Sequence, residues 1–161
     1  MKKKEHEIVF IAICFEEIMH EALVESSYLA ASVAAMSQPQ PLVSSLIVTV
    51  DETPLVRRAY KEAYASILPR LSAYATHGSK VDDEGMCFAL RLPLKRHEAL
   101  DDLLLHELRR AIVSYVLSRW YNGKSVQLAD DAMRRYEASM TMVLHDIHLS
   151  KPGTRRPVTY L

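Results

Sequence analysis

Apolar residues recur at helical spacing in the segment from about Glu7 to Met36. In its second half one face is apolar, and the opposite face carries glutamates at positions 16, 17, 21 and 25. The apolar face consists of Ile18, Ala22, Leu23, Tyr28 and Leu29. The run Ile8–Phe15 is ambiguous, because a short apolar run with several β-branched residues also suits a strand. We expect it to be helical and to continue into the helix that follows, which ends at the Pro-containing break Ser37–Pro41.

A second helix is predicted to begin at Thr53. A hydroxyl that caps the first turn, followed by Pro54 at a position that suits a helix start, is typical of a helix N-terminus. Apolar residues then recur at helical spacing as far as Leu71, and Pro69 should kink or shorten the last turn. The preceding segment Leu42–Val50 is apolar and β-branched but lies between helix breakers. We expect it to be an irregular packed segment or a short strand.

One strand is predicted from strict alternation. In Met86–Leu92 every second residue is large and apolar, whereas Arg91 lies on the opposite side. The polar, turn-rich segment Tyr74–Gly85 precedes it. The strand is therefore expected to be one arm of a hairpin whose other arm lies near Ser79–Val81.

Two long helices follow, over Glu98–Asn122 and from Ser125 to about His148. Gly123 stands where a C-terminal cap belongs, and Ser125 can cap the start of the second helix. The short link between the helices predicts that they pack antiparallel. The apolar stripes consist of Leu100, Leu103, Leu104, Leu108, Ala111, Ile112, Tyr115 and Val116 on the first helix, and of Ala129, Ala132, Met133, Tyr136, Met140, Val143, Leu144 and Ile147 on the second.

These elements predict a mainly α fold: a four-helix-type bundle with one short strand or hairpin inserted between the second and third helices. The chain has 161 residues, which is enough for one domain to bury a core without metals or disulfides. We expect a single helical domain over residues 1–150 and an extended basic arm over residues 151–161.

The charge balance narrows the classes of partner. Lys plus Arg total 20 and Asp plus Glu total 20, which speaks against a general nucleic-acid binder and leaves little self-repulsion to oppose association. Cys14 and Cys87 lie in apolar runs, as buried reduced thiols of a cytosolic protein do. Lys2–Lys4 followed by Ile8–Phe15 resembles an export signal, but acidic residues interrupt it and the apolar run is too short to span a bilayer. We expect a cytoplasmic location.

Metal and catalytic motifs are sparse. Glu17 and His20 have the Glu-x-x-His spacing of di-iron bundles, but no second such pair occurs. Asp102 with His106, and His145 with His148, could supply ligands but suit exposed helix faces equally well. The 4 glycines form no phosphate-binding loop, and the serines lack the glycines of a nucleophile elbow. We therefore expect neither an enzyme nor a bound metal or cofactor.

Two features are candidates for an interface. Trp120 and Tyr121 lie partly off the apolar stripe, either as interface anchors or as semi-exposed aromatics that close the helix end. The second feature is residues 151–161, which carry three cations and two prolines. The residues of interest there are Lys151, Arg155, Arg156, Val158 and Tyr160. Their alternation suits an arm that adds to a neighbour's sheet, such as an open edge of Met86–Leu92, although a chain end without a fixed partner is the alternative.

A family likeness rests on Glu107–Tyr121, Tyr136–Met140 and Lys151–Pro157. With the Met86–Leu92 strand and the Ile18–Ala35 helix, they resemble the small head–tail connector (adaptor) proteins of tailed phages and prophages. The resemblance implies a ring-forming structural protein between portal and tail, located in the host cytoplasm or the virion. Its partners would be other copies and portal or tail proteins, reached through the Tyr74–Gly85 loop and the arm, without a membrane or a specific nucleic acid. A helical metal-binding bundle that uses Glu17 and His20, or a small regulatory interaction module, is the alternative.

Overall fold

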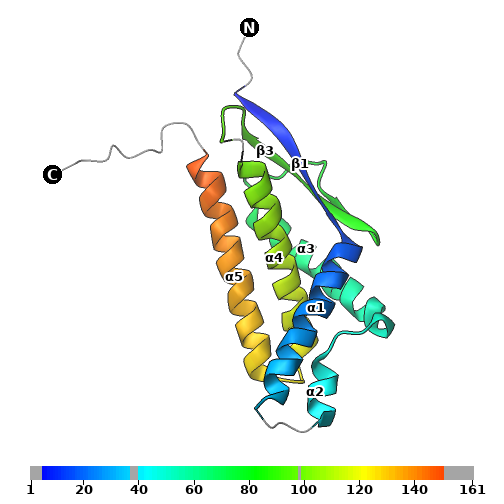
Figure 1. Ribbon diagram of the computed structural model, residues 1–161. Helices are drawn as coiled ribbons and strands as arrows, with labels where there is room; N and C mark the ends of the chain where they lie inside the picture. The colour runs from blue at the N-terminus through cyan, green and yellow to red at the C-terminus, as the bar shows by residue number, and fades with distance from the viewer. Residues whose placement is uncertain (1–4, 37–39, 98, 151–161) are drawn as a thin grey trace, which may run out of the picture.

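The computed structural model describes residues 5–36, 40–97 and 99–150. Its elements are, in chain order, β1 (His6–Cys14), α1 (Phe15–Ala34), α2 (Gln40–Leu46), a 3-10 turn (Val50–Glu52), α3 (Thr53–Arg70), β2 (Lys80–Val81), β3 (Gly85–Pro93), α4 (Leu100–Tyr121) and α5 (Val126–Leu149). Helix α5 is outermost, and α4 lies between it and the sheet, α1 and α3 (Figure 1). Helix α4 is therefore the central element of the described fold.

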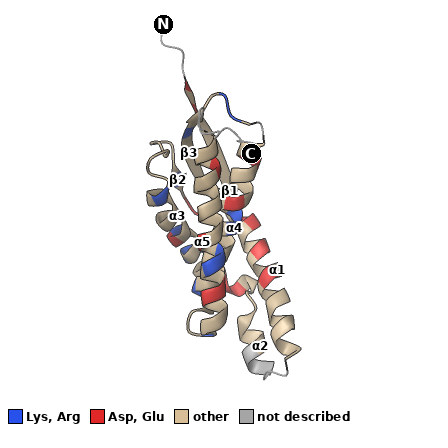
Figure 2. Cartoon of the chain, turned by 90° about the vertical axis from the view of Figure 1, so that its left-hand side faces the viewer, with Lys and Arg blue, Asp and Glu red and all other residues tan. Residues whose placement is uncertain are grey.

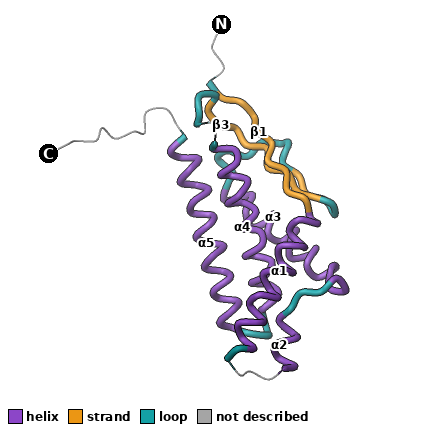
Figure 3. The backbone as a smooth tube through the Cα atoms, in the orientation of Figure 1, coloured by secondary structure: helices purple, strands orange, loops and turns teal. Residues whose placement is uncertain are grey.

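The fold is mixed α/β, so the expectation of a four-helix-type bundle was wrong. The described residues contain a three-stranded antiparallel sheet in the order β1-β3-β2 (Figure 3). The run Ile8–Phe15, expected to be helical, supplies most of β1. Its alternation is real, because Ile11 and Ile13 are buried whereas Ile8 and Phe10 face solvent. It was hidden in the sequence because both faces of the strand are apolar.

Strand β3 is the central strand and is paired along both sides. The predicted hairpin is confirmed, since β2 pairs with β3 through Lys80–Val81. The segment before β2 extends this pairing: the Arg91 amide donates to the Tyr74 carbonyl and the Thr76 amide to the Ala89 carbonyl, each at 2.8 Å. The strand expected to leave an open edge therefore has none. The edge strands of the described sheet are β1 and the 2-residue β2, and β1 has the longer open edge.

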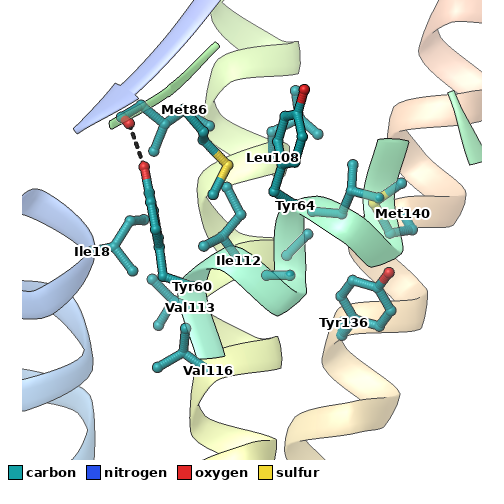
Figure 4. Close-up of a cluster of buried hydrophobic side chains, with 14 of the residues drawn as sticks. Ile18, Tyr60, Tyr64, Met86, Leu108, Ile112, Val113, Val116, Tyr136 and Met140 are labelled. Atoms are coloured by element: carbon teal, nitrogen blue, oxygen red, sulfur yellow. Dashed lines mark hydrogen bonds between the residues drawn. The ribbon is translucent and has the colours of Figure 1, made fainter. Parts of the chain in front are cut away.

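The passage from β1 into α1 has no loop, because Cys14 ends the strand and Phe15 begins the helix. The Phe15 amide donates to the Glu84 carbonyl at 2.8 Å, and its ring packs edge-to-face on Tyr60 at 5.3 Å. The buried Tyr60 hydroxyl donates to the Ile13 carbonyl at 2.7 Å (Figure 4). These contacts fix the start of α1 against α3 and the sheet.

Side chains from β3 and from four helices meet in one core. Met86 of β3, Ile18 of α1, Tyr60 of α3, Ile112 of α4 and Met140 of α5 all lie in it (Figure 4). Each is at most 2% exposed. The sheet and the helices therefore share one hydrophobic core.

Helix α2 corrects the expectation for Leu42–Val50, whose first half is helical rather than irregular or extended. The segment still packs as expected, since Leu46 and Val48 are buried. The Val48 amide donates to the buried Ser26 hydroxyl of α1 at 2.9 Å. This bond, made across a gap of 22 residues in sequence, holds the end of α2 against α1.

Helix α3 begins at Thr53 with Pro54 in its first turn, as predicted, and ends at Arg70, directly after Pro69. The predicted capping role of the Thr53 hydroxyl is wrong, because this hydroxyl donates to the Val50 carbonyl. The capping contact forms one turn earlier, where the Thr49 amide donates to the Glu52 carboxylate at 2.8 Å.

The antiparallel α4–α5 hairpin is confirmed (Figure 1). Gly123 adopts a φ of +82° in the link, and the Ser125 hydroxyl accepts a bond from the Leu128 amide. Three residues assigned to apolar stripes are instead exposed: Leu103 by 49%, Met133 by 36% and, in α1, Tyr28 by 75%. Each lies at the border of its stripe, where spacing alone does not fix the side on which the core ends.

We expect Leu108→Ala to lower the free energy of unfolding by about 2–5 kcal/mol, because this fully buried side chain would leave a cavity under the sheet. Leu103→Ala, in the same helix, is the matched control and should cost less than about 1 kcal/mol. Urea denaturation of both variants checks this. Equal losses would show that the orientation of α4 is wrong.

Candidate interaction surface

The outward face of β1 is apolar and open to solvent. Ile8 is 50% exposed and Phe10 is 65% exposed, and Ala12 and Cys14 continue the same face of the strand. The Phe10 ring packs close to Gly78. A Cβ placed on Gly78 would lie 3.0 Å from the Cβ of Ala89 and 3.1 Å from the Phe10 ring, so this glycine lets the ring lie close to the neighbouring backbone.

The same strand has an unpaired backbone edge. The Glu5 carbonyl accepts from the Leu94 amide, and the Phe15 amide donates to the Glu84 carbonyl, so residues with odd numbers direct their polar groups toward β3. Residues with even numbers, from His6 to Cys14, direct theirs the other way. None of the described backbone groups pairs with that side of β1. Such an edge can accept an added strand.

Charged groups lie at both ends of β1. At its start, Arg96 binds Glu7 and also the Asp101 carboxylate in the first turn of α4, the latter at 2.8 Å. At its end, Glu16 is exposed, and the neighbouring Glu17 lies 3.4 Å from Arg109. The apolar edge is therefore bordered by carboxylates where α1 begins.

A row of ion pairs that the sequence did not reveal joins α1 to the α4–α5 hairpin. Arg109 binds Glu21 as well as Glu17, and Arg135 binds Glu25. The helical spacing alone predicts that these glutamates lie on the solvent side of α1. Figure 2 shows acidic residues along the part of α1 that follows β1. Their four-residue spacing was visible in the sequence, but their partners lie 88 to 110 residues away.

Trp120 and Tyr121, the predicted interface or end-closing aromatics, both lie inside the fold. Trp120 is 8% exposed, and its indole donates to the Leu46 carbonyl at 2.8 Å. Tyr121 is fully buried, and burial raises the pKa of its hydroxyl to about 12. Helix α2 and the second half of α1 cover this end of α4, so neither ring is free to contact a partner in this conformation. Lys151, Arg155, Arg156, Val158 and Tyr160 lie outside the described residues.

The expected buried thiols differ from each other. Cys87 is partly buried, and burial raises the pKa of its thiol. Cys14 is exposed, which corrects the expectation that both are buried. The reason is the strand conformation of β1, which turns Cys14 outward on the face that carries Phe10. Both are free cysteines.

The residues considered as metal ligands are not gathered in one place. Glu17 pairs with Arg109, and His20 is exposed on α1. Asp102, His106, His145 and His148 are also exposed. Within the described ranges no group of three or more His, Cys, Asp or Glu side chains could hold a metal ion.

A groove of about 430 Å³ lies between the start of α3 and the end of α4. Several of its charged groups are already paired: Glu62 binds Arg58 at 3.1 Å and Arg119 at 3.0 Å. Lys124 lies over the Trp120 ring. The groove therefore offers a ligand fewer free groups than the outward face and edge of β1 do.

Comparison with protein-family models, with curated proteins and with solved structures finds no match to this chain. Among the described helices, none combines the length and the apolar character needed to cross a membrane.

We expect Asp101→Asn to make the fold less sensitive to acid. Arg96 holds the pKa of the Asp101 carboxyl below its ordinary value. The pair therefore contributes stability at neutral pH, which is lost as the pH falls below about 4 and the carboxyl takes up a proton. The melting temperature of the variant should be lower at pH 7 and should fall less steeply between about pH 5 and 3. Asp102→Asn, in the same helical turn, is the control. A slope equal to that of the unsubstituted chain would contradict this role for the pair.

We expect that chelation leaves the melting temperature unchanged, because Glu17 is engaged by Arg109 and His20 faces solvent. Differential scanning calorimetry with and without EDTA measures this. A fall of several degrees would instead support a metal that contributes to folding.

Proposed function

We propose that this chain is a non-enzymatic assembly protein that works by binding other protein subunits. Its specific form, as the sequence resemblance implies, is a head–tail connector subunit of a tailed phage or prophage. The observation that carries the proposal is the apolar outward face of β1, which lies beside an unpaired strand edge. An exposed edge with apolar side chains is normally blunted by charge or covered, because it binds further strands.

The nature of this surface supports a protein partner over a small ligand. Ile8 and Phe10 are exposed on one face of the strand, and the adjoining edge offers backbone donors and acceptors in a row. A row of this kind recognises extended polypeptide through main-chain hydrogen bonds. The neutral charge balance of the chain is compatible with close packing of many copies.

The test is whether the chain is part of virus particles. We expect mass spectrometry of particles purified from a bacterium that carries the coding sequence to detect it in stoichiometric amounts. Disruption of the coding sequence should yield filled heads without attached tails under the electron microscope. Tailed, infectious particles made without the chain would overturn the connector role.

The surface itself is tested by substitution. Phe10→Asp should reduce incorporation into particles, because it places a charge on the apolar face. Val126→Asp is the matched control, since Val126 is 76% exposed at the far end of α5, away from the sheet. Circular dichroism should show both variants folded. Equal incorporation of the two would mean that the β1 face is not the contact.

A further inference from the structure

We propose that residues 156–161 of a neighbouring copy add to the open edge of β1 as an antiparallel strand, with Tyr160 opposite Phe10. This inference rests on the proposed assembly function and names the contact through which it works. The added strand is a segment of this same chain. Three properties support this choice: its alternation of apolar and polar residues, its two arginines, and the length of chain that separates it from α5.

The alternation of the segment fits the two sides of the edge. With Tyr160 opposite Phe10, Val158 lies opposite Ala12, so two apolar side chains join the exposed face of β1. The opposite face of the segment then lies beside Val9 and Ile11, which belong to the core side of the strand. The added strand therefore extends the exposed apolar face beside Phe10 and Ala12, and brings Leu161 beside Val9 on the other face.

The position of the proline supports this register. In an antiparallel pair, opposed residues either exchange both hydrogen bonds or direct their polar groups away from each other. The even-numbered residues of β1 face the open edge, so Tyr160 and Val158 would bond to it. Pro157 falls opposite Ile13, where the polar groups of both residues point away. A proline has no N–H to donate, and this is a position at which none is needed.

Charge supports the antiparallel direction of the added strand. In the antiparallel direction, Arg155 and Arg156 come beside the end of β1, next to Glu16 and Glu17. Glu16 is exposed and makes none of the ion pairs found among the described residues. A parallel strand in the same position would instead bring Arg156 beside His6 and Arg155 beside Glu5, where the nearby Glu7 is already bound by Arg96. The antiparallel direction therefore brings the arginines to a carboxylate, Glu16, that the ion pairs of the described residues leave unused.

The segment cannot reach the β1 edge of its own copy, because the chain between α5 and the segment is too short. Helix α5 ends beside the start of α4, which Arg96 ties to Glu7 at the start of β1 (Figure 1). Arg156 must lie opposite Cys14, at the other end of this 9-residue strand, about 27 Å away. From Ser150 to Arg156 the backbone spans at most about 20 Å. The partner is consequently a second copy.

A disulfide trap tests the register and the exchange together. One copy carries Arg156→Cys and Cys14→Ser, and the other keeps its native Cys14; both carry Cys87→Ser. The full-length chains are mixed and oxidised with oxidised glutathione. We expect a covalent dimer of the two different copies, because opposed residues in a strand pair lie within disulfide range.

Two controls define the result. Thr159→Cys in place of Arg156→Cys puts the thiol three residues along, opposite Ile11, and should give little cross-linking. Ala12→Pro in the acceptor copy removes an outward N–H without touching the bonds to β3, and should slow cross-linking about tenfold. Glu16→Lys, an exposed substitution, should slow it as well and serves if Ala12→Pro unfolds the strand.

The outcomes are separate from those for particle incorporation. Cross-linking no faster with Arg156→Cys than with Thr159→Cys would overturn the strand addition, even if the chain is found in particles. Rapid disulfide formation within one copy that carries both Arg156→Cys and native Cys14, without the mixed dimer, would overturn it too. The mixed dimer at the expected position supports it, even if the particles prove to lack the chain.

Discussion

The direct passage of β1 into α1 is the constraint on which the rest of the arrangement depends. With no loop between Cys14 and Phe15, the direction in which the strand leaves the sheet sets where the helix begins. Phe15 is held there by the Glu84 carbonyl and the Tyr60 ring. Because α1 begins at a fixed point, its glutamates meet Arg109 and Arg135 in register. The buried Ser26 then holds the end of α2.

The same junction determines what the sheet can cover. The inward face of β3 packs on the helices, and its even-numbered residues from Met86 to Leu92 are at most 2% exposed. No described helix lies over the outward face of β1. The sheet thus has a dry side that stabilises the fold and an apolar wet side that does not contribute to the core. The exposure of Phe10 does not weaken the packing of the core, but an exposed aromatic side chain beside an open edge can bind other proteins non-specifically. A dedicated partner strand is one physical means of doing so.

The sequence predicted the four long helices, the α4–α5 hairpin and the β2–β3 pairing, because each depends on local spacing or on turn residues. It did not predict β1 as a strand. Alternation is a signal only when one face is polar, and here Ile8, Phe10 and Ala12 occupy the exposed face. The N-terminal strand also pairs with residues about 80 positions away, which local patterning does not register.

The candidate site was missed for the same reason as the strand. Trp120 stood out as an unusual aromatic, but a distant segment, the end of α2, covers it and accepts its hydrogen bond. Phe10 lies inside an apolar run, and nothing in the neighbouring sequence indicates that its side chain is exposed. Helix burial followed local spacing except at borders such as Leu103, whereas the exposure of a strand face depends on which elements pack above it. Surface features of this kind follow from tertiary structure rather than from composition.

The proposed strand exchange has a consequence for the symmetry of any assembly. The segment cannot reach β1 of its own copy, so it pairs with β1 of a second copy. The β1 edge of the first copy then remains open, and a third copy can add its segment there. The donor and acceptor surfaces are different, so the contact is head-to-tail and repeats from copy to copy. Repetition closes into a ring when the rotation between copies divides a full turn, and otherwise continues as an open filament. Two copies that paired β1 against β1 would instead form a closed dimer and stop. The geometry of this one edge therefore separates head-to-tail assembly, as a ring or a filament, from simple dimerisation.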